Sequence, residues 1–184
     1  MDEHSSNQDG KNLRKLFLKK IILFSALFLL VLGAATPLVY SKASNSPSFC
    51  ATCHVIKPYY RSWSEGPLLA AKHAAIGIKC VGCHQQSLPE KLKEGTGYIT
   101  GNYENPLKER DFSREKCLQC HEKDWGKVVQ ATNFEMSNPH ESHLGEIDCS
   151  LCHNMHRESE VNCAQCHDFD WFKTLDKSWK VQSQ

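Results

Sequence analysis

Residues 149–167 read CSLCHNMHRESEVNCAQCH and contain one pattern, Cys-x-x-Cys-His, twice. The pattern occurs three more times toward the N-terminus, so the ten cysteines of the 184-residue chain form five pairs, each followed directly by histidine. The five motifs are Cys50-Ala-Thr-Cys53-His54, Cys80-Val-Gly-Cys83-His84, Cys117-Leu-Gln-Cys120-His121, Cys149-Ser-Leu-Cys152-His153 and Cys163-Ala-Gln-Cys166-His167.

Cys-x-x-Cys-His is the attachment motif of c-type haem. Two thiols three residues apart lie on one side of a helical turn and reach the two vinyl groups of one porphyrin. The next histidine then faces the iron as its proximal ligand. Zinc sites would use the pairs two at a time and leave one of five unmatched, and a disulfide scaffold gives no reason for the histidines. The sequence therefore predicts five covalent haem c groups.

The distal iron ligands are expected among the histidines outside the motifs. Asn138-Pro139-His140-Glu141 reads as a capped helix start, which would put His140 and His143 at i and i+3 on one helix face. Two other histidines lie close to a motif and are expected to serve a different haem. His4 is expected on the cytoplasmic side, where it cannot reach a haem, so the four candidates are His73, His140, His143 and His156.

Four candidates for five irons leave one haem without a distal histidine. That haem is either five-coordinate or bound by Met136, Met155 or a lysine such as Lys57 or Lys72. An open iron would be a place where a small molecule binds. Bis-histidine ligation of the others implies low reduction potentials, because no methionine raises them.

Residues 21–40, IILFSALFLLVLGAATPLVY, carry no charge, and at 1.5 Å per residue a helix of this length spans about 30 Å. Basic residues precede this segment, so the positive-inside rule puts residues 1–20 in the cytoplasm and residues after 41 outside it. A cleavable signal peptide has the same order of regions, but its apolar part is about 7–15 residues long. A retained transmembrane anchor is therefore favoured.

The exported part, residues 44–184, offers about 28 residues for each haem, too few to wrap every porphyrin in its own apolar core. We expect a mostly α fold with sparse secondary structure: one transmembrane helix, then a compact multihaem domain whose core is made of stacked haems. Residues 41–184 hold 17 Lys/Arg and 18 Asp/Glu, which is not the charge balance of a nucleic-acid binder. Haem propionates would make the domain more acidic and favour a basic docking partner.

The N-terminal part resembles the NapC/NirT family of membrane-anchored multihaem quinol dehydrogenases. The resemblance covers residues 14–121 (44–121 within the exported domain) and rests on the anchor, the first three motifs, Pro58 and His73. It implies a first haem at the membrane surface beside a quinol pocket. Some members use a methionine two residues after the first motif histidine as a ligand; Ile56 stands at that position here, so this ligand is not carried over.

Residues 138–172 resemble the haem domain of tetrahaem flavocytochrome c fumarate reductases. The resemblance rests on Asn138-Pro-His140-Glu-Ser-His143, the last two motifs, His156 and Asp168-Phe169. It implies that the spaced histidines are distal ligands. Those enzymes pass electrons to a flavin on the same chain, whereas this sequence has no G-x-G-x-x-G, so a separate flavoprotein partner is implied.

These patterns together predict a membrane-anchored pentahaem cytochrome in anaerobic respiration. It would carry electrons from the membrane quinol pool, with menaquinol expected, to an extracytoplasmic reductase. Lys57, beside the first motif, is the candidate base for quinol oxidation. The alternative is a terminal reductase of a small nitrogen species at an open haem. A haem-based sensor fits poorly, because the tail before the anchor is too short to form an output domain.

Overall fold

The computed structural model describes residues 3–133 and 137–181, with side chains described for 14–36, 39–133 and 137–181. The chain divides into two compact units, Met1–Asn45 and Ser46–Gln184. Helices dominate and strand content is small, which confirms the expected fold class.

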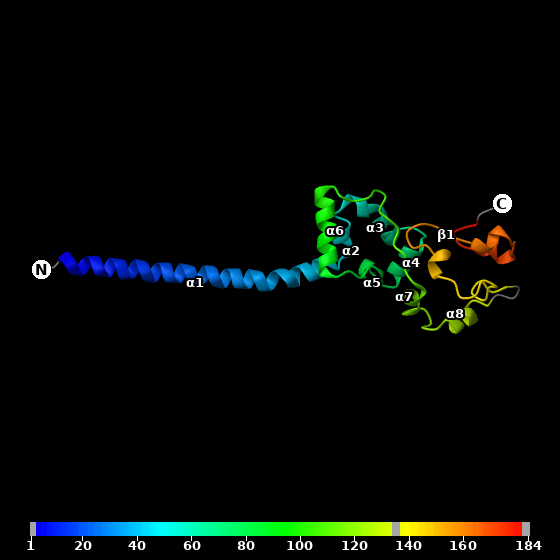
Figure 1. Cartoon of the computed structure of the whole chain (residues 1–184), viewed down its shortest axis with the longest axis horizontal. Coiled ribbons are helices and arrows are strands. Elements are labelled where there is room, and N and C mark those ends of the chain that lie inside the picture. The colour runs from blue at the N-terminus through cyan, green and yellow to red at the C-terminus, as the bar shows by residue number, and fades with distance from the viewer. Residues whose placement is uncertain (1–2, 134–136, 182–184) are drawn as a thin grey trace. The chain divides into compact units, whose positions relative to one another are not determined.

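The first unit is the single helix α1 (Glu3–Ser44), whose backbone stays helical through Pro37 (Figure 1). Its part Arg14–Ser44 is long and apolar enough to cross a membrane by length and composition, a property that a signal sequence shares. Large apolar side chains such as Leu23 and Phe24 are each 69% exposed along it. The segment predicted to span the membrane, residues 21–40, lies within this helix.

The second unit consists of short elements joined by turns, as Figure 1 shows. Its helices and strands are α2 (Pro47–Cys50), η1 (His54–Ile56), α3 (Lys57–Ser64), α4 (Leu69–Ala75), α5 (Cys80–Cys83), α6 (Leu88–Thr100), α7 (Arg114–Leu118), α8 (Trp125–Ala131), η2 (Cys149–Leu151), β1 (Ser159–Glu160), η3 (Asn162–Gln165), η4 (Asp170–Thr174) and β2 (Trp179–Lys180).

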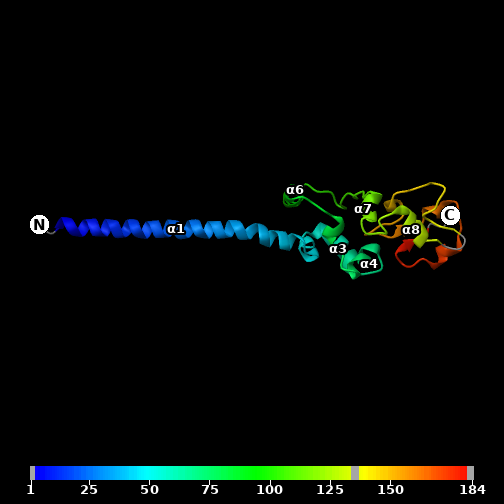
Figure 2. The ribbon, with the colours of Figure 1, turned by 90° about the horizontal axis from the view of Figure 1, so that it is seen from below.

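Helices α3 and α4 pack against each other, and Figure 2 shows them side by side. Pro58 lies in the first turn of α3, where a missing backbone donor costs nothing. The Trp63 indole donates to the Ile78 carbonyl at 2.9 Å. The buried Ala70 in α4 donates its backbone N–H to the Met155 carbonyl at 3.0 Å. This bond joins α4, which lies between the first and second motifs, to the loop that follows the fourth motif.

Helix α6 has sequence-coded signals at both ends. Ser87 and Glu90 form a capping box at its start. At its end Gly101 has φ 74°, a left-handed conformation that glycine adopts without strain. The Asn102 N–H donates to the Gly97 carbonyl at 2.8 Å and the Gly101 N–H to the Tyr98 carbonyl at 3.2 Å, the paired bonds of a Schellman motif. The chain therefore turns back sharply after α6.

The C-terminal segment forms a small apolar core around Val161, Ala164 and Phe172. Strands β1 and β2 pair in parallel beside it, with Ser159 opposite Trp179. The fully buried Ser178 accepts the Ser159 N–H on its carbonyl at 2.8 Å. This core is small for a unit of this length, so the polypeptide alone buries little apolar surface.

The prediction of a helix that starts at Asn138 is wrong. The Asn138 side-chain oxygen accepts the His140 N–H at 3.0 Å, two residues ahead, and its amide donates to the Val129 carbonyl at 2.6 Å. The first bond makes an Asx turn instead of a helix cap. Residues 138–145 consequently form turns.

Candidate haem-binding sites

Four of the five motifs share one backbone geometry. Their histidine N–H donates to the carbonyl of the first motif cysteine, four residues back, at 2.8–3.0 Å. This bond closes one turn of helix, so both cysteines and the histidine lie around a single turn. The motif histidines with this bond are His84, His121, His153 and His167.

The first motif differs from the other four. Cys53 has an extended backbone, with φ −81° and ψ 123°, which ends the helical turn before the histidine. The His54 N–H donates instead to the Tyr98 hydroxyl at 3.4 Å. The sequence of this motif gives no sign of the difference.

The histidine rings form four close pairs, each joining one motif histidine to one of the four predicted distal histidines. The centroid separations and interplanar angles are 5.9 Å and 76° for His121–His73, 6.1 Å and 23° for His84–His156, 6.1 Å and 4° for His153–His140, and 6.2 Å and 84° for His167–His143. Neither His73 nor His156 faces the motif nearest to it in sequence.

These separations fit two imidazoles that bind one iron from opposite faces. An imidazole nitrogen binds a transition metal at about 2.0–2.1 Å, and its ring centre lies about 1.1 Å further away, so two axial rings have centres about 6.3 Å apart. The two cysteines of a motif lie beside each of these pairs, so the donor set suits haem c.

Three of the predicted distal histidines are held by a hydrogen bond on Nδ1. His73 Nδ1 lies 2.8 Å from the Leu69 carbonyl, which accepts only, so Nδ1 carries the proton. His156 Nδ1 lies 2.8 Å from Ser62 Oγ, whose own proton goes to the Tyr59 carbonyl. Each bond leaves the Nε2 lone pair for a metal, the usual arrangement of a ligating histidine.

His140 is held in the same way. Its Nδ1 lies 2.7 Å from Thr132 Oγ1, which donates its own proton to the Val128 carbonyl at 2.8 Å. Neither hydroxyl, that of Ser62 or that of Thr132, was predicted from the sequence, because no motif spacing connects them to the histidines they hold.

Burial keeps several of these imidazoles neutral, the form that binds iron. It lowers the pKa values of His84, His140 and His156. It lowers the pKa of His153 to about 4, with a smaller contribution from the neighbouring His140 and His121. A neutral imidazole offers its lone pair without first losing a proton.

The motif cysteines approach one another in chain order. Cys50 hydrogen bonds with Cys80, which lowers the pKa of Cys50 to about 6 and raises that of Cys80. Cys83 lies near Cys120, Cys117 near Cys149, and Cys152 near Cys163. In each pair burial raises the pKa of the first-named thiol most, and the neighbouring cysteine raises it further. Successive motifs are therefore neighbours in space, from the first to the fifth.

His54 has two tyrosines beside its ring, where the other motif histidines have a distal histidine. Its Nδ1 lies 2.9 Å from the Tyr98 hydroxyl and its Nε2 lies 3.5 Å from the Tyr103 hydroxyl. The two phenol rings stack at 5.5 Å between centroids. Neither tyrosine was singled out in the sequence, because they lie more than forty residues after the motif they contact.

The other candidates for the fifth iron lie in varied surroundings. Lys57, the proposed quinol base, begins α3 and is exposed close after the first motif. Lys72 binds Asp176 at 2.5 Å and Ser178 at 3.0 Å, so its ammonium is already engaged. Met155 lies beside His156 in the chain, and Met136 lies outside the described residues.

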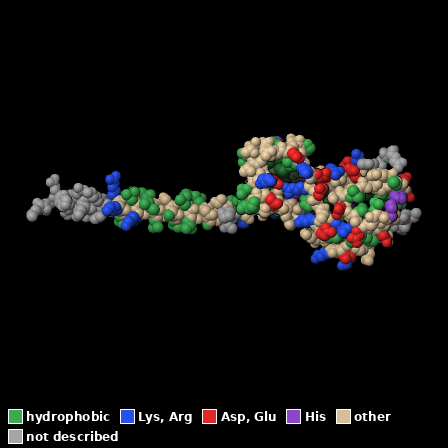
Figure 3. Space-filling model, viewed as in Figure 1, with side chains coloured by type: hydrophobic (Ala, Val, Ile, Leu, Met, Phe, Trp, Pro, Cys, Tyr) green, Lys and Arg blue, Asp and Glu red, His purple; other side chains and the backbone are tan. Residues whose placement is uncertain are grey.

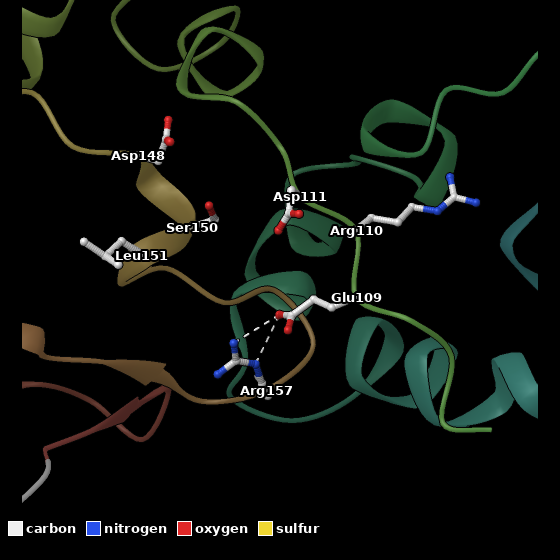
Figure 4. A pocket seen from close by; sticks show the side chains of 7 residues that line it. All are labelled: Glu109, Arg110, Asp111, Asp148, Ser150, Leu151 and Arg157. Carbon is white, nitrogen blue, oxygen red and sulfur yellow. Dashed lines mark hydrogen bonds and ion pairs between the residues drawn. The ribbon is translucent and has the colours of Figure 1, made fainter. Parts of the chain in front are cut away.

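One polar cavity of about 290 Å³ lies beside the fourth motif (Figure 4). Glu109 and Arg157 form an ion pair in it at 3.1 Å, and Asp111 faces the same space. No predicted haem ligand lines it. Acidic and basic side chains are also intermixed over the face of this unit in Figure 3, without a single-sign patch there.

Comparison with known proteins supports the haem assignment. Residues 100–168 match the cytochrome c3 family. The chain is 35% identical over 146 residues to the cytochrome c-type protein Cgr1 of Eggerthella lenta, covering 62% of this chain and 68% of that protein. It is 29% identical over 109 residues to the cytochrome c-type protein NrfH of Wolinella succinogenes, covering 52% and 57%. No solved structure matches.

A third relative is the probable fumarate reductase Ifc3 of Shewanella frigidimarina, 31% identical over 96 residues, which cover 52% of this chain and 13% of that protein. The motifs, the fold and these relatives define a multihaem c-type cytochrome. The chain belongs to the NapC/NirT-type family of such cytochromes, as its sequence resemblance indicated.

Proposed function

We propose that this chain is a membrane-anchored pentahaem cytochrome that conducts electrons from membrane quinol to an extracytoplasmic reductase. The four histidine pairs carry this proposal, because each joins a motif histidine to a distal histidine at the spacing of two axial ligands. Bound haem c supplies one-electron chemistry at its iron. The cysteine pairs of all five motifs would hold it covalently.

The chain's own residues would fix each ligand before it binds. Ser62, Thr132 and the Leu69 carbonyl orient His156, His140 and His73. Burial favours the neutral ring of His153. Because both rings of a pair are already in place, little rearrangement accompanies a change of iron charge, and this favours fast electron exchange.

The order of the motifs in space supports a linear path. Consecutive motifs have neighbouring cysteines, so the attached groups would follow one another from the first motif to the fifth. They would fill much of the interior of residues 44–184, in keeping with the small polypeptide core. Electrons would enter at the first motif and leave near the fifth.

Membrane attachment would place the first motif next to the quinol pool. The basic residues before residue 21 favour an N-terminus in the cytoplasm, residues 21–40 as the anchor and residues 44–184 outside. Lys57, close after His54, would accept a proton from the quinol, for which menaquinol is the expected donor.

The acceptor we propose is a separate extracytoplasmic flavoprotein reductase. The similarity to part of the probable fumarate reductase Ifc3 favours a reductase as the acceptor. Net charge after residue 41 is slightly negative before any propionate is added, which favours a partner with a basic docking surface.

The unusual surroundings of His54 favour one second candidate, reduction of a small nitrogen species at the first haem. That reaction needs an iron position open to an added ligand. Turnover of nitrite or hydroxylamine by the reduced protein without any partner would support this candidate over electron transfer.

Two measurements test the main proposal. Intact mass should show five haems on one chain, and paramagnetic resonance should show four low-spin bis-histidine irons. Anaerobic addition of a reduced menaquinol analogue to the membrane-embedded protein should then reduce the haems rapidly. Lys57→Gln should slow this reduction, whereas Lys127→Gln, an exposed lysine on α8, should not. Fewer than five haems, or no reduction by quinol, would refute it.

A further inference from the structure

We propose that Tyr103 supplies the distal oxygen ligand of the iron at the first motif, and that Tyr98 positions the proximal His54. This inference rests on the proposed attachment of haem at Cys50 and Cys53. It assigns a ligand to the one motif whose histidine faces no second histidine among the described residues.

The two tyrosines contact different nitrogens of His54. Tyr98 lies 2.9 Å from Nδ1, the nitrogen that points away from the iron in ligating histidines. Its hydroxyl also receives the His54 backbone N–H at 3.4 Å, so one oxygen fixes both the ring and the backbone of that residue. Tyr98 therefore orients the His54 ring through Nδ1, as the Leu69 carbonyl orients the His73 ring.

Tyr103 lies on the opposite edge of the same ring. Its hydroxyl is 3.5 Å from Nε2, the nitrogen that would bind the iron. Two ligands on opposite faces of one metal, each bound at about 2.0 Å, have donor atoms about 4 Å apart. The Tyr103 oxygen is within about half an ångström of that separation, and its side chain, 37% exposed, is free to adjust.

The end of α6 explains how the two tyrosines come together. Tyr98 is in the last turn of the helix, and the left-handed Gly101 reverses the chain directly after it. A Cβ on Gly97 would meet the Asn102 carbonyl at 3.0 Å, so the reversed chain lies close against the helix. Tyr103 then stacks on Tyr98, with 30° between the rings.

Phenolate oxygen is a known axial ligand of haem iron. On ferric iron, the Tyr103 oxygen forms the iron–oxygen bond and its phenolic proton leaves to solvent. An anionic oxygen favours ferric over ferrous iron, so this haem would have a lower potential than with a neutral ligand. Reduction would weaken the bond and open the distal side, next to the expected quinol site.

The test uses the full-length membrane protein and three variants: Tyr103→Phe, Tyr98→Phe and, as matched control, Tyr60→Phe, which packs on Trp63. The haem number of each is read first from its intact mass. Resonance Raman of the ferric wild type should show iron-tyrosinate bands. Tyr103→Phe should lose them, gain one high-spin iron per chain and raise the potential of that haem, whereas the Tyr60→Phe spectrum should equal that of the wild type.

Tyr98→Phe should keep the tyrosinate bands but shift the iron–histidine frequency, because only the Nδ1 partner is lost. Five haems by mass without tyrosinate bands would overturn the ligation and leave the electron-transfer proposal standing. Loss of the bands in Tyr98→Phe but not in Tyr103→Phe would overturn the assignment of the two roles. A chain with no haem at the first motif would overturn both proposals.

Discussion

A single hydroxyl decides which nitrogen of His156 can bind a metal. Ser62 donates its proton to the Tyr59 carbonyl and so accepts from His156 Nδ1, which leaves Nε2 unprotonated. Thr132 repeats this arrangement for His140 with a different side chain from a different helix. Two independent occurrences indicate that ligand orientation is built into the polypeptide.

Ser62→Ala should weaken the binding of His156 to the haem at the second motif by about 10–100-fold, the usual effect of losing a partner of a ligating histidine. Carbon monoxide binding to the reduced protein measures this, because a loosened distal ligand is displaced more easily. Ser64→Ala is the matched control, since Ser64 is on the same helix and bonds only to the Arg61 carbonyl. Equal carbon monoxide binding by the two variants would contradict the prediction.

Acid should release the buried His153 only at low pH. Burial lowers the pKa of His153 from 6.5 to about 4, so the unfolded chain binds more protons than the folded chain between these values. Stability from this group is complete above pH 6.5 and is lost as pH falls toward 4. Protonation thus removes this buried ligand only at low pH.

The haem held by His153 and His140 should therefore keep its low-spin spectrum on acidification from pH 7 until the pH approaches 4. Absorbance and paramagnetic resonance across the titration measure the conversion. His140→Ala should already contain one high-spin haem at pH 7 and should lack the low-pH step. An unchanged low-pH step in that variant would show that another pair opens there.

The histidines that face the motif histidines could be predicted from the sequence, but the side chains that hydrogen bond to them could not. Each predicted distal histidine lies opposite a motif histidine. Ser62, Thr132, Tyr98 and Tyr103 were not predicted, because serine, threonine and tyrosine have no spacing that sets them apart from ordinary surface residues. Their role depends on which segments meet in space.

At the scale of elements, helix α6 has local signals at both ends. It begins at a capping box and ends at a left-handed glycine, although no helix was predicted there. The segment after Asn138 carries a similar starting signal and forms turns, because the Asn138 side chain bonds to the backbone two residues ahead and to Val129. A cap residue with a competing local or tertiary partner does not start a helix.

Gly101→Ala should cost about 1–2 kcal/mol, because φ 74° is strained for any residue with a Cβ. The strain should also displace Tyr103 from His54. Thermal unfolding measures the first effect and the tyrosinate bands of the first haem measure the second.

Gly95→Ala is the control for this change, because a Cβ there meets nothing within 4 Å and Gly95 is inside α6. That variant should gain about 0.5–1 kcal/mol and keep the first haem unchanged. Loss of stability in both variants, or unaltered haem spectra in Gly101→Ala, would contradict this account of the turn.

At the scale of the molecule, the pairing of histidines and the order of the motifs in space depend on long-range contacts, which the sequence alone does not predict. The five motifs are visible in the sequence, yet His84 of the second motif pairs with His156, which follows the fourth. The order of the motifs in space also depends on contacts such as that between Cys117 and Cys149. Hydrophobic pattern gives little help, because only a few side chains form a polypeptide core.

In the proposed linear path, the haem at the third motif is an obligatory step. His121→Met would keep the covalent haem at Cys117 and Cys120 and replace one axial nitrogen with a thioether sulfur, which raises the reduction potential. Electrons from quinol should then collect at this haem and leave it slowly.

Stopped-flow absorbance should show that in His121→Met about one haem in five is reduced early and stays reduced while an artificial acceptor is present. His167→Met, at the far end of the chain of motifs, should leave electron entry to the other four haems at the wild-type rate. If both variants pass electrons to the acceptor as fast as the wild type, the motifs do not form a single path, and a branched arrangement must replace the linear one.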